Sequence, residues 1–315
     1  MAEVATSASS SANSSARSDQ LLVVVDPVAR RTDGESVRIA KDVLSAGAAG
    51  TKVCLPDDPE EFARALGRRG SRRPVVVGDD RALLRAVGLL HRRRELAGCA
   101  LSVVPVGPAL GLARSLGLPT GAVAAARAVL DGAERRMDLL VDDSDGVVLG
   151  AVGIPSGPSG GAREHGGDAA RGESGAGLPW LRTCQALVRT LTASRAGRVT
   201  VSPGAGGVPA RLRVEIDGAT LVDLDQPVEA VSLIPGPAGM AVVEVRTVPV
   251  AAEPGAKGAP VPVPVALTGS GRAVTVSGAD FRYRADAVVS GPVRTRTWTV
   301  REGAWGLMLP VVPVV

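Results

Sequence analysis

Three short, uninterrupted apolar runs in the first half of the chain constrain its fold most. Leu21–Val25 reads LLVVV, Pro74–Gly78 reads PVVVG and Leu101–Pro105 reads LSVVP. A strand that is apolar at every position, instead of every second one, is buried on both faces, as in a parallel sheet that helices cover on each side. Thr51–Leu55 and Met137–Val141 have the composition of two further strands in the same region.

Stretches with helical periodicity lie between these runs. Asp57 and Asp58 precede one of them, and the helix dipole favours acidic residues near a helix start. The alternation of strand and helix predicts a Rossmann-like, parallel α/β domain over residues 21–140. The expected helices are Glu35–Ser45, a helix running through Ala65, Ala82–Leu96, Ala109–Leu116 and Ala122–Leu130.

The pattern changes after about Leu140. Short segments of strand composition, separated by turn residues, predict an antiparallel β-sandwich domain over residues 141–300. One helix, Trp180–Ala193, is expected to interrupt it. The predicted strands are Val147–Val152, Arg198–Ser202, Arg211–Ile216, Ala219–Leu224, Val228–Ile234, Met240–Val248, Val263–Thr268, Ala273–Ser277, Phe281–Val288 and Arg294–Val300.

Three stretches lack the composition of a packed element. The Ser/Ala-rich residues 1–20 are predicted to be a disordered tail and not a signal peptide, because no basic region precedes an apolar one. Residues 156–177 are rich in Gly and Ser and are predicted to form a flexible loop. Ala251–Pro262, rich in Pro and Gly, is predicted to be a second loop.

The composition limits the class of protein. Of the 315 residues, 45% are hydrophobic, which is enough for two ordinary cores, and the net charge is +4. This mild charge permits attraction to anionic lipid or phosphate without requiring it, and we expect no nucleic-acid partner. No apolar run approaches the roughly 20 residues that span a bilayer. We expect a soluble, cytoplasmic protein whose contact with a membrane, if any, is peripheral.

The cysteines and histidines predict neither a disulfide framework nor a metal site. The cysteines are odd in number, lie far apart and form no C-x-x-C pair, which fits a reducing cytoplasm. They are Cys54, Cys99 and Cys184. His91 and His165 have no metal-ligand spacing, and His91, beside Arg92–Arg94, is predicted to be a solvated surface residue.

Several segments resemble the diacylglycerol and sphingosine kinase family, in the correct order. Leu101–Pro119, LSVVPVGPALGLARSLGLP, is similar to the family's IIPLGTGNDFARALGIP run. Val23–Pro27 resembles its first strand, which ends in Asn-Pro, and Val75–Asp79 resembles the strand that enters GGDGT. Arg136–Leu139 is similar to the xIDLG segment, and Phe281–Pro310 to the closing YxADGE … W … LMLP run.

The resemblance covers Leu21 to Pro310 and implies an α/β nucleotide domain followed by a β-sandwich. It also implies that the C-terminal segment, residues 301–315, returns to the first domain. The family's activity is ATP-dependent phosphoryl transfer to a lipid hydroxyl, so ATP and Mg are the implied cofactors. The closing run favours this family over the NAD kinases, which have a similar build and a GGDGT signature and are a weaker alternative.

The resemblance also assigns positions in the nucleotide site. Val77–Arg81, the first loop, corresponds to GGDGT, and Gly107–Gly111, the second loop, to GTGND. The candidate catalytic residues are Asp79 and Asp286, with Val288 at the position of the family's general base. The candidate cofactor-binding residues are Asp26, Pro27, Gly78, Asp79, Arg81 and Gly107, and no metal ligand is assigned.

The first loop departs from the family pattern. In GGDGT the backbone amides approach phosphates beside a helix N-terminus. Val77 replaces a glycine where close approach or positive φ is needed, and Asp80 replaces another with a carboxylate. Two like charges about 4 Å apart cost on the order of 4 kcal/mol at an effective dielectric near 20, which Arg81 would offset in part.

The second loop and the base position depart as well. The second loop reads GPALG and lacks the family's hydroxyl, amide and carboxylate, while Leu83 and Leu84 replace the Asn-Glu that follows GGDGT. Val288 can neither accept nor orient a proton, and loss of a positioned base typically costs about 10²- to 10⁴-fold. Because phosphoryl transfer depends on positioning and charge stabilisation, these changes predict a pseudokinase or binding module.

The aspartates of the site also have a structural interpretation. Asp79 and Asp80 are typical first-turn residues of a helix that begins near Ala82. Asp286 is either a turn residue or a remnant of the site. An active lipid kinase that uses Asp79, Asp80 and Arg81 as a non-standard metal and phosphate site is therefore the alternative function.

Other candidates also have both a structural and a binding interpretation. Gly78 and Gly107 are either turn glycines or points of close ligand approach. Asp26 with Pro27 is typical of a strand-to-turn exit. The arginine clusters at residues 68–73 and 92–94 are either solvated faces or contacts with membrane lipid, at an anionic membrane surface.

Overall fold

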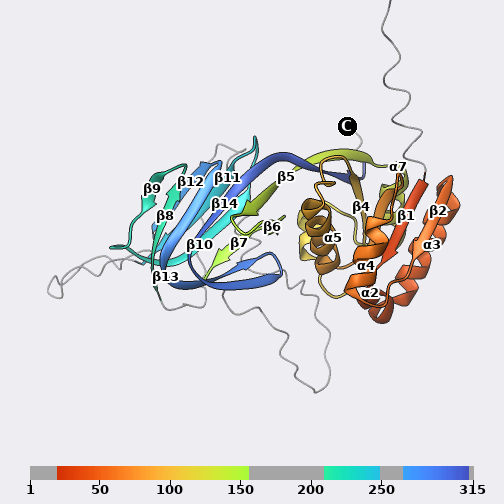
Figure 1. Cartoon of the computed structure of the whole chain (residues 1–315), viewed down its shortest axis with the longest axis horizontal. Coiled ribbons are helices and arrows are strands. Elements are labelled where there is room, and N and C mark those ends of the chain that lie inside the picture. Colours follow the sequence, from red (N-terminus) through yellow and green to blue (C-terminus); the bar gives the residue numbers. More distant parts are fainter. Residues whose placement is uncertain (1–19, 156–208, 249–264, 312–315) are drawn as a thin grey trace, which may run out of the picture. The chain divides into compact units, whose positions relative to one another are not determined.

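The computed structural model describes residues 20–155, 209–248 and 265–311, which divide into two compact units (Figure 1). The first unit contains the described residues up to Leu149 and those from Arg301 onward, and the second contains those between Gly150 and Val300. Most of the predicted tail 1–20, the helix Trp180–Ala193 and the strand Arg198–Ser202 lie outside the described residues, as do the loops 156–177 and Ala251–Pro262. Gln20, predicted to end the tail, is instead the first residue of a strand. The predicted domain boundary at residue 140 falls nine residues before the division between the units.

Four parallel strands form the sheet of the first unit. Their order is β4-β3-β1-β2, and Val23 of β1 pairs with Val53 of β2 and Val75 of β3. The three apolar runs are confirmed as buried strands. The bounds are β1 (Gln20–Val25), β2 (Gly50–Cys54), β3 (Arg73–Gly78) and β4 (Ala100–Pro105).

Helices pack on both faces of this sheet, which explains why every position of its central strands is apolar. In β1, Leu22 and Val24 pack with α4, α5 and α6, whereas Leu21 and Val23 pack with α3 and α7 on the other face. No helix within the described ranges is long and apolar enough to cross a bilayer. The helices are α2 (Pro27–Thr32), α3 (Gly34–Gly47), α4 (Pro59–Gly67), α5 (Asp80–Arg92), α6 (Gly111–Ser115) and α7 (Ala122–Asp131).

Helix α2 was not predicted, because Asp26 with Pro27 was interpreted as a strand-to-turn exit. The Asp26 side chain accepts the Val28 N–H and so caps the helix, and Pro27 at the first position has a φ suited to a helix start. The same dipeptide can therefore begin either a turn or a helix. Here the chain continues as a short helix.

Helix α5 begins two residues earlier and ends four residues earlier than predicted. Asp79 is its N-cap, and its C-terminus is set by Arg94, which has φ 57°, and by the Glu95 N–H, which donates to Leu90 O at 2.9 Å. His91, predicted to be a solvated surface residue, is only partly exposed. Its side chain is 22% exposed and its Nε2 lies 2.8 Å from Asp145 Oδ1.

The last described segment of the chain adds a strand to the first unit. Gly306 and Leu307 of β14 (Val288–Leu309) pair in parallel with Ala100 and Leu101 of β4. Strand β5 (Ala133–Asp142) pairs with β14 and with β6 (Val147–Val148). The buried Trp305 donates its indole N–H to Asp138 O at 3.3 Å, so the segments similar to xIDLG and to the closing run meet here.

The second unit consists of antiparallel strands. The predicted strand Ala273–Ser277 and the first part of Phe281–Val288 form one long strand, β13, with a register shift between Ser277 and Phe281. The second prediction runs too far, because β13 ends at Ala285 and Val288 already belongs to β14. Because the pairings link the strands into one connected set, a layout of two stacked sheets stays a prediction. The strands are β7 (Val152–Ile154), β8 (Ala210–Ile216), β9 (Ala219–Val222), β10 (Pro227–Pro235), β11 (Ala241–Thr247), β12 (Val265–Gly271), β13 (Ala273–Ala285) and β14 up to Val300.

Alternation of buried and partly exposed residues builds the core of this unit. In β11, Ala241, Val243 and Val245 are buried, and the residues between them are not. The fully buried Trp298 meets Tyr283 edge to face, with ring centroids 5.2 Å apart. Two large rings thus supply core volume in a chain that has only 2% aromatic residues.

Candidate functional site

The candidate residues of the first unit gather where three parallel strands end. Asp26 follows β1, Gly78 ends β3, and Gly107 lies two residues after β4. The Asp26 N–H donates to Val77 O at 2.8 Å, and the Val106 N–H donates to Gly78 O at 3.0 Å. The carboxyl edge of a parallel sheet is where such folds bind ligands, so this edge is the candidate site.

Both carboxylate oxygens of Asp26 are held by the protein. The residue is 2% exposed, and its Oδ1 accepts the Val28 N–H at 2.8 Å. Its Oδ2 accepts from Arg85 of α5 at 2.7 Å, and the Arg85 guanidinium lies 5.5 Å from the centre of the Phe62 ring. Arg85 was not identified from the sequence. The sequence offered one indication, because Arg85 is the single charged residue in the apolar first half of the predicted helix Ala82–Leu96.

The glycines of the site are explained by packing. A Cβ on Gly78 would lie 2.5 Å from the Cβ of Ala82 and 3.0 Å from that of Asp26. Gly107 has φ 130°, and a Cβ there would lie 3.1 Å from the Cβ of Asp79. Both positions therefore need glycine for the contacts between the loops themselves.

Asp79 acts as the N-cap of α5. Its Oδ1 accepts the N–H groups of Arg81 at 3.0 Å and Ala82 at 3.2 Å. This is the standard way to satisfy free N–H groups at a helix start. The first loop thus keeps a helix N-terminus, but a side chain of the chain itself binds two of its amides.

Asp80 reaches away from its own helix and caps a different one. Its Oδ2 accepts the Leu112 N–H and its Oδ1 the Ala113 N–H, both at 2.9 Å, in the first turn of α6. The Asp80 N–H donates to Ala109 O in the second loop at 2.8 Å. With 7% of its surface exposed, Asp80 joins the first loop to the second loop through one hydrogen bond and to helix α6 through two.

The electrostatic state of Asp80 follows from this position. Burial raises the pKa of its carboxyl above the ordinary value of 3.8. The N–H groups of Leu112 and Ala113 act in the opposite direction, and the neighbouring charge of Asp79 raises the pKa further. Asp79 and Asp80 thus place two carboxyl groups where a phosphate-binding loop needs positive potential.

Two other first-loop positions differ from expectation. Val77 is a fully buried strand residue that pairs with Val25 and Val104, so it belongs to the core and does not line a loop. Arg81 has an exposed side chain, and in the described part of the chain no ion pair joins it to Asp79 or Asp80. Whether Arg81 offsets repulsion between Asp80 and a bound phosphate stays a prediction.

Asp286 belongs to the second unit, where it holds a turn. With Ala287 it forms the two-residue connection between the paired Ala285 and Val288, and its φ is 49°. Its Oδ1 accepts the N–H groups of Gly150 and Ala151, both at 2.8 Å. Val288, at the family's base position, is 54% exposed. The geometry gives Asp286 a structural task within its own unit.

Comparisons with known proteins agree with an α/β first unit of the lipid-kinase type. Residues 20–141 match the family described as the diacylglycerol kinase catalytic domain. Over these residues the chain is similar to that family. The match is to the lipid-kinase family and not to the NAD-kinase alternative. No curated protein matches the chain.

Solved structures support the diacylglycerol-kinase-like fold over a longer stretch. A diacylglycerol kinase from Bacillus anthracis str. Sterne has a TM-score of 0.61 and 12% identity, with 94% of this chain and 98% of that chain covered. A second structure from that organism, assigned as a diacylglycerol kinase, has a TM-score of 0.62 at 12% identity and covers 94% and 99%. At this identity the likeness concerns the fold: a mixture of helices and strands with a large sheet.

The family implies ATP and Mg, but the loops of this diacylglycerol-kinase-like site do not fit the phosphate groups. The Asp79 and Asp80 carboxylates accept four N–H groups at the starts of α5 and α6. Across residues 20–155, 209–248 and 265–311, no group of three or more His, Cys, Asp or Glu side chains is arranged to hold a metal ion. The amides that would receive a phosphate already have an anionic partner.

We predict that Asp80 makes folding more favourable as the pH falls. Its folded-state pKa is raised, so the folded protein binds this proton more tightly than the unfolded chain does. The stability of the wild type relative to Asp80→Asn should increase as the pH is lowered through the raised pKa toward 3.8. Urea unfolding across this range measures the difference.

Asp33→Asn is the matched control for this pH dependence. Asp33 is an exposed N-cap whose pKa is lowered by its hydrogen bonds with Ser36. Its stabilising effect is present above the unfolded pKa and is lost as the pH falls through the folded pKa, so the wild type should lose stability relative to Asp33→Asn. The same sign for both variants would contradict the assignment of Asp80.

We also predict that Asp286 acts through stability. Asp286→Ala leaves two N–H groups without an acceptor and places alanine at positive φ, which should cost about 2 kcal/mol and lower the unfolding midpoint by several degrees. Asp286→Asn keeps an acceptor oxygen and tolerates this φ, so it should cost less than about 1 kcal/mol. Equal stability of Asp286→Ala and the wild type would show that Asp286 has no role in holding the turn.

Proposed function

We propose that this chain is a binding module built on the lipid-kinase fold, and that it does not transfer phosphate from ATP. The observation that supports this proposal most directly is the position of the Asp80 carboxylate, which accepts the Leu112 and Ala113 N–H groups. An internal carboxylate there competes with a nucleotide phosphate for the same amides, and it adds like-charge repulsion.

Three further losses point in the same direction. The second loop has no hydroxyl, amide or carboxylate side chain between Gly107 and Gly111. Val288 replaces the family's general base, and Val77 is part of the core. Because catalysis of phosphoryl transfer needs the phosphate cradle and the nucleophile-orienting base together, restoring one of these features does not restore the others.

The first experiment asks whether the wild type binds Mg-ATP and phosphorylates a lipid. Purified protein is titrated with Mg-ATP by calorimetry and assayed for phosphorylation of diacylglycerol and of ceramide-type lipids. We expect no turnover of either lipid. Turnover would establish the alternative, an active lipid kinase with a non-standard site at Asp79, Asp80 and Arg81.

We predict that Asp80→Gly improves Mg-nucleotide affinity over the wild type by at least tenfold, since each factor of ten is about 1.4 kcal/mol. The substitution removes the competing charge, frees the two α6 amides and restores a family glycine. Asp80→Asn is the control for charge alone, because it removes the charge but keeps the side-chain volume over those amides. We expect its affinity to lie between those of the wild type and Asp80→Gly.

The contribution of Arg81 is tested in the improved background. Arg81→Ala added to Asp80→Gly should weaken nucleotide binding again, because Arg81 is the cation of the first loop. If Asp80→Gly binds Mg-ATP no better than the wild type, the loops do not keep the phosphate-binding geometry, and the similarity to the family is one of fold only.

We predict that Val288→Glu alone produces no lipid kinase activity. Val288 is more than half exposed at the start of β14, so a glutamate fits there without burial and should leave the unfolding midpoint nearly unchanged. Activity should stay absent because the first and second loops are unaltered. Turnover of diacylglycerol by this single variant would show that the loops are still competent.

A further inference from the structure

The ends of helices α4 and α5 bring two arginine clusters together. Arg68 is the C-cap of α4 and Arg93 the C-cap of α5. The Arg93 guanidinium lies over Gly67, in the space that a side chain at this glycine would occupy. The two clusters, about 25 residues apart in the sequence, thus form one surface. This arginine surface consists of Arg68, Arg69, Arg72, Arg92, Arg93 and Arg94.

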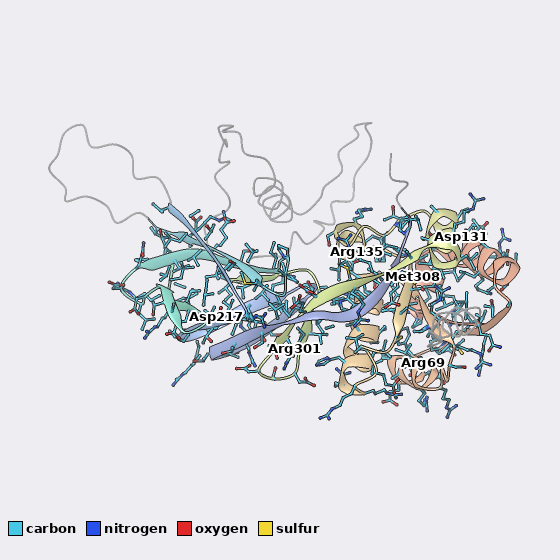
Figure 2. The ribbon with its side chains drawn as sticks, turned by 90° about the horizontal axis from the view of Figure 1, so that it is seen from above. Arg69, Asp131, Arg135, Asp217, Arg301 and Met308 are labelled. Carbon is cyan, nitrogen blue, oxygen red and sulfur yellow. The ribbon has the colours of Figure 1, made fainter. Side chains whose placement is uncertain are left out.

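The arginine surface carries uncompensated positive charge. Arg69, labelled in Figure 2, pairs with Glu95. Within the described ranges, the other five arginines form no ion pair, and Arg68, Arg92, Arg93 and Arg94 are exposed. Helix C-termini favour nearby cations by about 0.3–1 kcal/mol each. This interaction at two helix ends accounts for the presence of one or two arginines. It does not account for five arginines without an ion pair on the same surface.

This surface lies at the opposite edge of the sheet from the loops. The segments after α4 and α5 lead into the amino ends of β3 and β4, whereas Asp79 and Asp80 follow the carboxyl end of β3. Helix α5 has 13 residues, which corresponds to about 20 Å at 1.5 Å per residue. An anion bound at the arginine surface is therefore not a substrate of the candidate site.

We infer that the arginine surface docks the first unit on an anionic lipid bilayer. Arginines near such a surface contribute about 1 kcal/mol each, without any requirement for sequence or a pocket. Single-stranded nucleic acid is disfavoured because no described residue of this surface is an exposed aromatic side chain on which a base could stack, and Phe62 of α4 is fully buried. The inference is independent of the proposed lack of phosphoryl transfer, since it concerns the other edge of the sheet.

The experiment is co-sedimentation of the full chain with vesicles of phosphatidylcholine, with and without phosphatidylglycerol. The test variant is Arg68→Gln/Arg92→Gln/Arg94→Gln. The control variant, Arg31→Gln/Lys52→Gln/Arg127→Gln, removes three exposed positive charges from α2, the edge strand β2 and α7. Each variant lowers the net charge from +4 to +1, so they differ in the position of the lost charge and not in its amount.

We expect the wild type to bind only the vesicles that contain phosphatidylglycerol, and to bind less as salt is added. The test variant should bind about ten- to a hundredfold more weakly, and the control variant within about threefold of the wild type. If the test variant fails to fold by circular dichroism, the single Arg92→Gln should still show a loss of about fivefold.

Three results would overturn the inference: no binding of anionic vesicles by the wild type, equal losses in the test and control variants, or tighter binding of a short DNA duplex than of the vesicles. The second would assign the binding to overall charge, and the third would identify a nucleic acid as the partner. Mg-ATP titration of the test variant separates the two proposals, because its result should equal that of the wild type.

Discussion

The carboxylate of Asp80 is the interaction on which the arrangement of the site depends. A buried charge is expensive unless hydrogen bonds satisfy it, and here two amides of α6 do so while the Asp80 N–H binds Ala109 O. These bonds connect the start of α5 with the second loop and with the start of α6. The chain thereby supplies from its own sequence the negative charge that, in a phosphate-binding loop, a ligand brings.

The carboxylate of Asp80 explains why the first and second loops can differ from the family pattern at other positions. Once no phosphate needs to approach, Val77 is free to be a core residue, and the second loop needs no polar side chain to orient a nucleotide. Gly78 and Gly107 are still required, because Asp26, Ala82 and Asp79 pack closely against them. Packing therefore preserves the backbone of the two loops, whereas the side chains by which the family's loops bind a nucleotide are replaced.

Much of the first unit could be predicted from the sequence, because its signals are local. Apolar runs such as Leu21–Val25 identify strands buried on both faces, and helix starts follow capping residues. The contacts of the site are not local: Asp80 meets Leu112 across 32 positions, and Arg85 meets Asp26 across 59. The sequence correctly placed Asp80 in the first turn of a helix, and Asp79 is the N-cap of that helix. Only the fold shows that Asp80 also binds the start of a second helix.

Helix α5 separates two regions of opposite charge, and distance keeps them independent. Asp79 and Asp80 lie at its N-terminus, and Arg92–Arg94 at and beyond its C-terminus, a disposition that the helix dipole stabilises at both ends. About 20 Å of helix exceeds the Debye length of about 8 Å at physiological ionic strength. The carboxylates of the site therefore do not neutralise the arginine surface. The proposed loss of phosphate binding at one end of α5 and the proposed docking of an anionic surface at the other are therefore compatible, because the two depend on different atoms of the same helix.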